Sequence, residues 1–316
     1  MITLSDIQKA HERIKPYIIE TPIVRLPNLD KILGCQVYAK PECLQVTGSF
    51  KIRGALNKML QLNKTELSKG VVAASSGNHG KALCYGAKLL GTRASIVIPT
   101  SAPEVKEKAI LALGGEVTRA DVTKRFEVAE QICKEKGAIF IHPFNDLDVI
   151  AGQGTLGLEI CSQMPSLTAV ITPLSGGGLL GGVATAIKET NPNIKVYGAE
   201  PAALPRYTES LKKGEPVTVP TKPTLADALP AIRPGDNCFL QVKKYVDGVF
   251  DVSDEYLMKA SKALLLEGHL LAEFSSAIGI AAVMQGCIKF KETDKVCFVI
   301  SGGGVDLPQL DLLKEY

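Results

Sequence analysis

The sequence predicts two α/β domains of unequal size, each a mostly parallel sheet flanked by helices. Short, unbroken apolar runs alternate with amphipathic segments of helical period along most of the chain. Such runs are typical of strands that are buried on both faces, as in parallel sheets. They are too many for one small sheet, and a chain of 316 residues is long enough for two moderate domains.

The boundaries of the predicted elements follow from capping residues, glycines and prolines. Five prolines between Gly214 and Asp236 predict a long irregular connection. In chain order, the predicted elements are a helix capped at Ser5-Asp6-Ile7-Gln8 and ending near Lys15, an extended segment with Pro22 and Pro27, a strand at 37–39, a helix at 55–62, a strand at 70–74 with a helix to Leu90, a strand at 94–98, a helix at 105–113, a strand at Val117, a helix at 124–136, a strand at 138–141, a helix at 151–162, strands at 168–172 and 194–199, helices at 253–266 and 276–288, and a strand at 296–300.

We expect the chain to leave the larger domain once and return to it. The larger domain is predicted to comprise residues 1–67 and 146–316, and the smaller one residues 68–145. Composition does not mark either of these boundaries.

Composition excludes several classes of function. The net charge is only +3, no basic block stands out and Trp is absent, which argues against a nucleic-acid partner. The N-terminus lacks the pattern of a secretory signal, and no apolar run approaches the ~20 residues that cross a bilayer. Eight scattered cysteines without a Cys-x-x-Cys pair predict reduced thiols, a cytoplasmic protein and no zinc site.

The stretch from Thr47 to Ala55 carries the first candidate catalytic residue. Gly48 permits backbone angles that other residues avoid, and Ser49 is expected to cap the following helix. Lys51 then lies in a first helical turn, where the helix dipole disfavours a further positive charge. A neutral amine can attack a carbonyl group to form an imine, although a solvated lysine at a helix start is the alternative.

Three glycine-rich loops, each led by a serine, directly follow apolar strands. They span Ser75 to Gly80, Ser175 to Gly182 and Ser301 to Gly304. Ligands of open parallel sheets lie at the carboxyl ends of the strands, where glycines leave backbone N–H groups free to face them. A single loop of this kind could be a tight turn, but three of them predict a shared binding site.

The middle loop leads into a helix and is suited to a phosphate group. The pattern Gly176-x-Gly178-x-x-Gly181, with Glu200 ending the next strand, also fits a dinucleotide fingerprint, so a nicotinamide-binding protein is an alternative. That alternative leaves Lys51 and the other two loops without a role. An imine-forming lysine, a phosphate loop and two polar loops together match what pyridoxal 5'-phosphate requires.

At these residues the sequence resembles the fold-type II pyridoxal phosphate enzymes, specifically the threonine/serine dehydratase and serine racemase group. The likeness covers nearly the whole chain and implies a two-domain, tryptophan synthase β-like fold. Four motifs carry it in order: Gly48-Ser49-Phe50-Lys51-Ile52-Arg53-Gly54-Ala55, Ser75-Ser76-Gly77-Asn78-His79-Gly80, Ala151-Gly152-Gln153-Gly154-Thr155 and Ser301-Gly302-Gly303.

The resemblance also implies a role for each matching residue and a homodimer. The implied roles are Lys51 as the Schiff-base lysine, Phe50 packed beside the cofactor ring, Asn78 bonded to the ring hydroxyl, Ser75, Ser76, Gly77, Asn78 and His79 around the substrate carboxylate, Ser175, Gly176, Gly177, Gly178 and Leu179 around the phosphate, and Ser301 at the pyridine nitrogen. A serine does not hold a proton on that nitrogen, which favours expulsion of a β-substituent.

The resemblance implies β-elimination from threonine or serine, with Lys51 taking the Cα proton and a 2-oxo acid and ammonia as products. Serine racemisation is the alternative, because Ser76 matches a racemase serine on the face opposite the lysine. Ser76 could instead simply bond to the loop backbone.

Two departures from the family pattern stand out. Ser175 replaces the first glycine of the phosphate loop, and Arg206 replaces an acidic residue that, with the equivalent of Glu200, binds a divalent ion in racemase-like members. Arginine cannot ligate a cation, so no metal site of that type is expected. The chain ends shortly after Ser301, so feedback control by an appended C-terminal domain is not expected either.

Three further residues have weaker assignments. His79 is expected to structure its loop rather than act as a base. Asp227 lies in a segment that resembles one near the cofactor, or caps a helix, and Arg125 either reaches a substrate carboxylate or lies on a solvated helix face.

Overall fold

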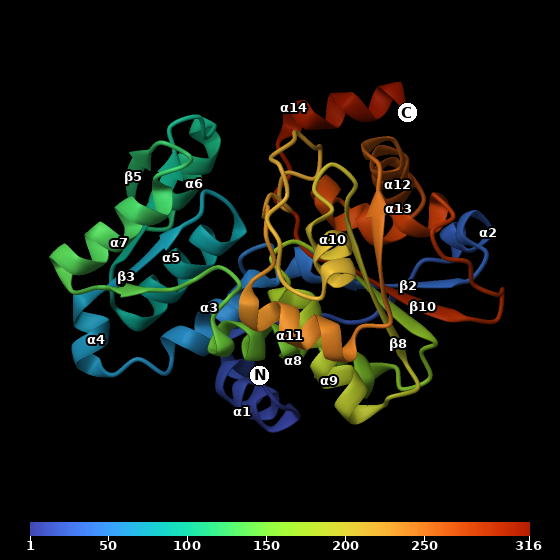
Figure 1. The fold of residues 1–316 in the computed structure, drawn as a ribbon, viewed down its shortest axis with the longest axis horizontal. Helices are drawn as coiled ribbons and strands as arrows, with labels where there is room; N and C mark the ends of the chain where they lie inside the picture. Colours follow the sequence, from blue (N-terminus) through green and yellow to red (C-terminus); the bar gives the residue numbers. More distant parts are fainter.

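Two parallel-stranded sheets organise the chain, which a computed structural model describes from residue 1 to residue 316. Figure 1 shows them as two lobes side by side, with the chain ends on the larger lobe. The larger sheet has the strand order β1-β2-β10-β7-β8-β9, and only β1 runs antiparallel to its neighbour. The smaller sheet, β5-β4-β3-β6, is parallel throughout. The predicted α/β class with mostly parallel sheets is confirmed.

The strands and helices alternate as the apolar pattern predicts. The strands are β1 (Val24–Arg25), β2 (Gln36–Pro41), β3 (Val71–Ala74), β4 (Ala94–Pro99), β5 (Glu116–Ala120), β6 (Ile139–Phe140), β7 (Ala169–Pro173), β8 (Lys195–Pro201), β9 (Gly248–Val252) and β10 (Lys295–Ile300). The α-helices are α1 (Leu4–Ile14), α2 (Asp30–Leu33), α3 (Lys51–Met59), α4 (Lys64–Lys69), α5 (Asn78–Leu90), α6 (Glu104–Ala112), α7 (Arg125–Lys136), α8 (Leu147–Gln163), α9 (Gly178–Thr190), α10 (Arg206–Lys213), α11 (Asp236–Tyr245), α12 (Asp254–Leu266), α13 (Ile278–Met284) and α14 (Leu307–Leu310).

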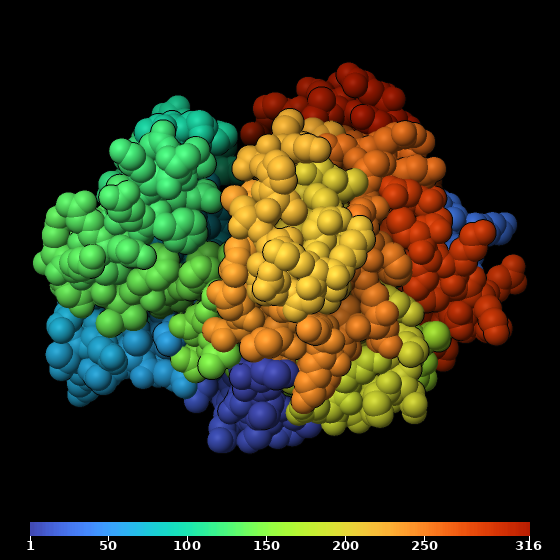
Figure 2. Space-filling view, viewed as in Figure 1, coloured from blue at the N-terminus to red at the C-terminus, as the bar shows by residue number.

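The smaller sheet is built from one continuous part of the chain, between Val71 and Phe140. Its central strands β3 and β4 are buried along their whole length, which explains their unbroken apolar sequences. The space-filling view shows the two lobes meeting along a line that opens into a notch beside the C-terminal helix (Figure 2). The exact domain boundaries stay a prediction.

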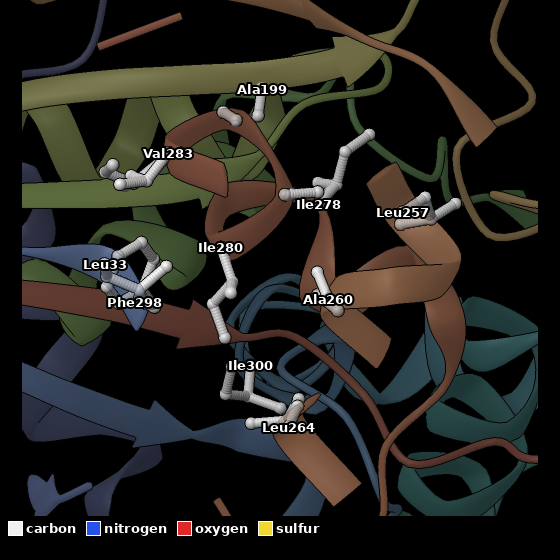
Figure 3. Packing of buried hydrophobic residues seen from close by; sticks show 14 of the residues in the cluster. Leu33, Ala199, Leu257, Ala260, Leu264, Ile278, Ile280, Val283, Phe298 and Ile300 are labelled. Atoms are coloured by element: carbon white, nitrogen blue, oxygen red, sulfur yellow. The ribbon is translucent and has the colours of Figure 1, made fainter. Parts of the chain in front are cut away.

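The largest hydrophobic core lies on one face of the six-stranded sheet. Figure 3 shows side chains of β10 packing with those of α12 and α13. Phe298 and Ile300 alternate with Cys297 and Val299, which face a second core on the other side of the sheet. Because β10 is buried on both faces, its sequence is apolar without interruption. None of the helices combines the length and the apolar character needed to cross a bilayer.

Two capping predictions are wrong. The first helix is capped by Thr3, which exchanges hydrogen bonds with Asp6, and not by Ser5. Ser49 does not cap α3, because the residue before this helix is Phe50 and the Ser49 hydroxyl is buried without a partner. The helix begins at Lys51 itself, so the predicted place of Lys51 in a first turn is confirmed.

A network of buried charges fixes the first turn of α3. The Arg53 guanidinium donates to both carboxylate oxygens of Glu42, at 2.7 and 2.9 Å, and to the carboxylate of Glu159 on α8. Lys40 on β2 donates to Glu159 at 2.7 Å, so the network holds two cations and two anions. These four side chains are buried from water. The network ties α3 to β2, to the turn after β2 and to α8.

Removing one carboxylate of this network is expected to be costly. Glu159→Ala leaves Lys40 without an ion-pair partner and Arg53 with Glu42 alone, and an uncompensated buried charge costs about 3–5 kcal/mol of unfolding free energy. Urea unfolding followed by circular dichroism measures this cost. The matched control is Glu209→Ala, which breaks an exposed pair with Lys212 and costs about 0–1 kcal/mol. Equal effects of the two substitutions would contradict the role given to the network.

Candidate active site

The segment before Lys51 is bound to the loop that follows β10. The N–H of Phe50 donates to the carbonyl of Ser301 at 3.1 Å, and the N–H of Gly303 donates to the carbonyl of Gly48 at 2.8 Å. Gly48 has a φ of +73°, in the left-handed region that favours glycine. Two of the sequence motifs therefore form one hydrogen-bonded unit, with Lys51 at its edge.

The amine of Lys51 lies in a poorly hydrated environment. It donates to the backbone carbonyl of Pro143 at 2.7 Å. Burial lowers the pKa of Lys51 to about 8, against an ordinary value of 10.5, and the nearby Glu273 only partly offsets this shift. A sizeable fraction of the amine is consequently neutral near pH 8, which is what attack on an aldehyde requires.

The middle glycine loop lies beside the segment to which Lys51 bonds. The ring of Phe144 fills the space where Gly176 would carry a side chain, and its backbone approaches Gly178 in the same way. Gly177 has a φ of +101° and is the N-cap of α9. None of the six backbone N–H groups from residue 175 to residue 180 has an acceptor within the chain, although five of these residues are buried. This arrangement is suited to an anion.

The loop after β3 also has backbone N–H groups without acceptors. The backbone N–H groups from residue 75 to residue 80 have no acceptor within the chain, and α5 begins at Asn78. His79 is buried, and its Nε2–H donates to the carbonyl of Ile141 at 3.0 Å. Burial, and then the charge of Lys51, lowers the pKa of His79 to about 3, so the ring stays neutral. These contacts support a structural role for His79.

The loop after β10 lies next to two residues that no sequence motif contains, Ser276 and Glu273. Ser301 places its hydroxyl 3.1 Å from that of Ser276, which also accepts from the N–H of Gly302. Beside them, the carboxylate of Glu273 accepts from the amide of Asn78 at 3.0 and 3.1 Å. A side chain at Gly302 would collide with Glu273, so this glycine makes room for the carboxylate. The Asn78–Glu273 contact joins the two lobes.

The loops converge on one lysine. Burial lowers the pKa of both His79 and His142, and the nearby charge of Lys51 lowers it further. Burial also lowers the pKa of Lys51, and the charge of Glu273 offsets part of that shift. His142 accepts from the N–H groups of Phe144 and Asn145, which shapes the segment that contacts Lys51. Each of the three loops therefore lies near Lys51 or next to a residue that adjoins or contacts it: the loop at 75–80 through His79, the loop at 175–182 through Phe144 beside Pro143, and the loop at 301–304 through Phe50.

Glu200 and Arg206 are bound to each other rather than to a ligand. The Glu200 carboxylate accepts from the N–H groups of Tyr207 and Thr208 at the start of α10, and Arg206 lies 3.6 Å away. A carboxylate engaged in this way is not free to bind a ribose. No group of three or more His, Cys, Asp or Glu side chains is arranged so that it could hold a metal ion.

The two remaining candidates, Asp227 and Arg125, have different surroundings. Asp227 forms an ion pair with Lys106 at 3.2 Å and caps no helix. Arg125 opens α7, is partly buried and leaves its Nε without a partner, so the solvated helix face does not describe it. Burial lowers its pKa.

Comparison with known proteins identifies the family. The sequence profile of the family described as "Pyridoxal-phosphate dependent enzyme" matches residues 14–302. The chain belongs to this family. L-threonine ammonia-lyase of Thermotoga maritima is 42% identical over 314 residues, which cover 98% of this chain and 78% of the relative. Serine racemase of Dictyostelium discoideum is also 42% identical over 314 residues, which cover 98% of this chain and 97% of the relative.

A solved structure shows the same fold. Maize serine racemase superposes with a TM-score of 0.94 at 38% identity, covering 99% of this chain and 97% of that one. The resemblance to the fold-type II pyridoxal phosphate enzymes is thus confirmed, and pyridoxal phosphate is the cofactor of this family. The nicotinamide alternative is not supported.

The residues present fit that cofactor. The N–H groups at 175–180 offer six donors without acceptors to a phosphate, at the N-terminus of a 13-residue helix. Lys51, whose pKa is lowered to about 8, offers an amine to an aldehyde. The hydroxyl of Ser175 accepts from the N–H of Ala231, which leaves its own proton available to a further acceptor.

Sequence reasoning missed several residues of this pyridoxal-phosphate enzyme's site. Glu273, Pro143, Phe144 and Tyr207 belong to no glycine-rich motif, and each reaches the site only through the tertiary fold. A weak signal existed for one of them, because Phe140, His142 and Phe144 alternate, and the ring of His142 lies 6.1 Å from that of Phe140 and 4.5 Å from that of Phe144.

The burial of Glu273 beside Asn78 predicts a pH-dependent difference in stability. Burial raises the pKa of Glu273 from 4.5 to about 7, so the folded protein binds this proton more tightly than the unfolded chain does. The group's contribution to the free energy of unfolding therefore falls as pH rises from about 4.5 to about 7, by up to about 3 kcal/mol. Glutamine does not titrate, so Glu273→Gln removes this decrease in the free energy of unfolding.

The melting temperature of Glu273→Gln relative to wild type should consequently be higher at about pH 8 than at about pH 5. Differential scanning fluorimetry on protein without added cofactor measures the difference. The exposed substitution Glu209→Gln is the control and should show no such trend. A difference for Glu273→Gln that is the same at both pH values would refute a raised pKa.

Proposed function

We propose that the protein is an ammonia-lyase that eliminates water from threonine or serine and yields a 2-oxo acid and ammonia. The observation that supports this most is that Lys51, with its lowered pKa, lies near two loops whose N–H groups lack acceptors. One loop suits the phosphate of the cofactor and the other suits the carboxylate of an amino acid. L-threonine ammonia-lyases are among the relatives.

Each group of the site has a proposed task. Lys51 holds the cofactor and, once free, takes the Cα proton at its Nζ. The N–H groups of residues 75–79 orient the substrate carboxylate, Phe50 packs beside the ring and Ser301 faces the ring nitrogen. Asn78, held by Glu273, faces the ring hydroxyl. Bound pyridoxal phosphate supplies an aldehyde that bonds to an amine and a ring that withdraws electrons from Cα.

Serine racemisation is the second candidate, and Ser76 favours it. Its side chain is partly exposed, and its hydroxyl forms no hydrogen bond within the chain, so it is free to exchange a proton. Serine racemases also match nearly the full length of the chain. In this proposal Ser76 acts on the substrate face opposite Lys51.

The wider setting is proposed on the same basis. We infer a cytoplasmic homodimer that acts on a small amino acid, with no nucleic-acid or membrane partner. All eight cysteines are free, which agrees with a reducing compartment. The larger domain at 1–67 and 146–316 binds the cofactor, and the smaller domain at 68–145 closes on the substrate.

A substrate panel tests the proposal. Purified protein with pyridoxal phosphate is incubated with L-serine, D-serine, L-threonine and L-threo-3-hydroxyaspartate, and both 2-oxo acid formation and the enantiomer ratio are followed. Ammonia-lyase activity predicts oxo acid from L-threonine or L-serine. If none of the four substrates gave an oxo acid, the lyase assignment would be rejected.

Ser76→Ala separates the two activities. The substitution removes the only hydroxyl proposed to act opposite Lys51, so racemisation should vanish while dehydration, which needs Lys51, continues. Chiral chromatography and an oxo-acid assay on the same sample measure both activities. Ser68→Ala, on the exposed helix α4, is the matched control. Loss of elimination together with racemisation in Ser76→Ala would show that the assignment of the two faces is wrong.

A further inference from the structure

The first turn of α10 holds the carbonyl side of the phosphate loop. Arg206 is fully buried, and its guanidinium donates to the carbonyls of Leu174, Ser175 at 3.2 Å and Leu204 at 2.8 Å. The next residue, Tyr207, is equally buried, and its hydroxyl donates to the carbonyl of Gly176 at 3.1 Å. Three successive carbonyls, from residue 174 to residue 176, are thereby bound by two adjacent side chains.

The tyrosine also sets the shape of the loop. A side chain at Gly177 would overlap the Tyr207 hydroxyl, with a Cβ only 1.8 Å from the oxygen. Gly177 therefore has to be a glycine both for its φ of +101° and for this contact. The hydroxyl and the loop backbone are in direct van der Waals contact on this side.

The contacts that hold the carbonyls of the loop also orient its N–H groups. A peptide unit points its carbonyl and its N–H in opposite directions, so binding the carbonyls of residues 174–176 directs the N–H groups of residues 175–177 away from α10. These are three of the six N–H groups that lack an acceptor, and those of 178–180 follow at the start of α9. Successive free N–H groups of this kind form an anion-binding concavity.

The buried charge of Arg206 is balanced where it lies. Glu200 is 3.6 Å away and also accepts from the N–H groups of Tyr207 and Thr208, so it anchors the first turn of α10. The carboxylate thus holds both the guanidinium and the helix turn in place. Glu200, Arg206 and Tyr207 act on the loop as one unit.

We propose that Arg206 and Tyr207 are positioning residues that set the affinity of this protein for the phosphate of its cofactor. Neither contacts the phosphate in this proposal; both act through the carbonyls of the loop. The proposal rests on the assignment of the loop at 175–179 to the phosphate, as given under the proposed function. It predicts an effect on the phosphorylated cofactor that is absent for the same aldehyde without phosphate.

Tyr207→Phe tests this with the smallest change available, because it removes one hydroxyl and keeps the ring. The full-length chain is freed of cofactor and reloaded with either pyridoxal phosphate or pyridoxal, and affinities are measured by equilibrium dialysis. Loss of one buried hydrogen bond predicts about 3- to 10-fold weaker binding of pyridoxal phosphate. Binding of pyridoxal should be unchanged. Tyr245→Phe, which removes a hydroxyl bonded to Glu189 on the surface, is the matched control.

Two outcomes would overturn the proposal: unchanged affinity of Tyr207→Phe for pyridoxal phosphate, or equal weakening of both aldehydes. Arg206→Lys keeps the charge beside Glu200 but offers fewer donors, and it should shift the same ratio, which covers the case that Tyr207→Phe does not fold. The visible absorption of lysine-bound cofactor is recorded in parallel. If this absorption is absent from the wild-type protein while Tyr207→Phe weakens binding of the phosphorylated aldehyde alone, the lysine assignment is rejected and the positioning role is supported.

Discussion

The site depends on a buried ion network two residues beyond Lys51. Arg53 binds Glu42 and Glu159 at once, and Lys40 completes the charge balance. Taking four charged groups out of water is favourable only when their geometry is satisfied, so the network permits little freedom in where α3 begins. It fixes Lys51 relative to β2 and α8 without any contact to a ligand.

Close backbone packing reinforces that placement. Gly54 and Gly152 allow α3 and α8 to approach so closely that a Cβ on either would meet the other helix. Thr155 of the same helix donates to the carbonyl of Gly152 and accepts from Arg53 at 3.2 Å. The motif at 151–155 is thus explained by its contact with α3, the helix that begins with Lys51, and it helps to hold that helix in place.

The parts of the fold that the sequence predicted are those governed by local rules. Lys51 in a first helical turn, the strands around the three loops and the free N–H groups all follow from apolar runs ended by glycines. Ser49 shows the limit of such rules, because a serine before a helix is a cap only if the helix starts directly after it. Here the residue directly before the helix is Phe50, one residue after Ser49.

Other parts depend on residues that are distant in sequence. Glu273 lies 195 residues from Asn78, and nothing in its own neighbourhood indicates that a glycine at 302 makes room for its carboxylate. The edge strand β9 and helix α11 were not predicted, since the residues of β9 are mostly only half-buried and its apolar pattern is weak. Such features follow from packing, which a local pattern cannot express.

The central claim is that the amine of Lys51 holds the cofactor against the loop at 175–179. The most direct measurement is borohydride reduction of the protein with pyridoxal phosphate, followed by proteolysis and mass spectrometry of the peptides. The account predicts a reduced phosphopyridoxyl group on Lys51. A group found on any other lysine, or the same labelling of a Lys51→Ala protein, would contradict it.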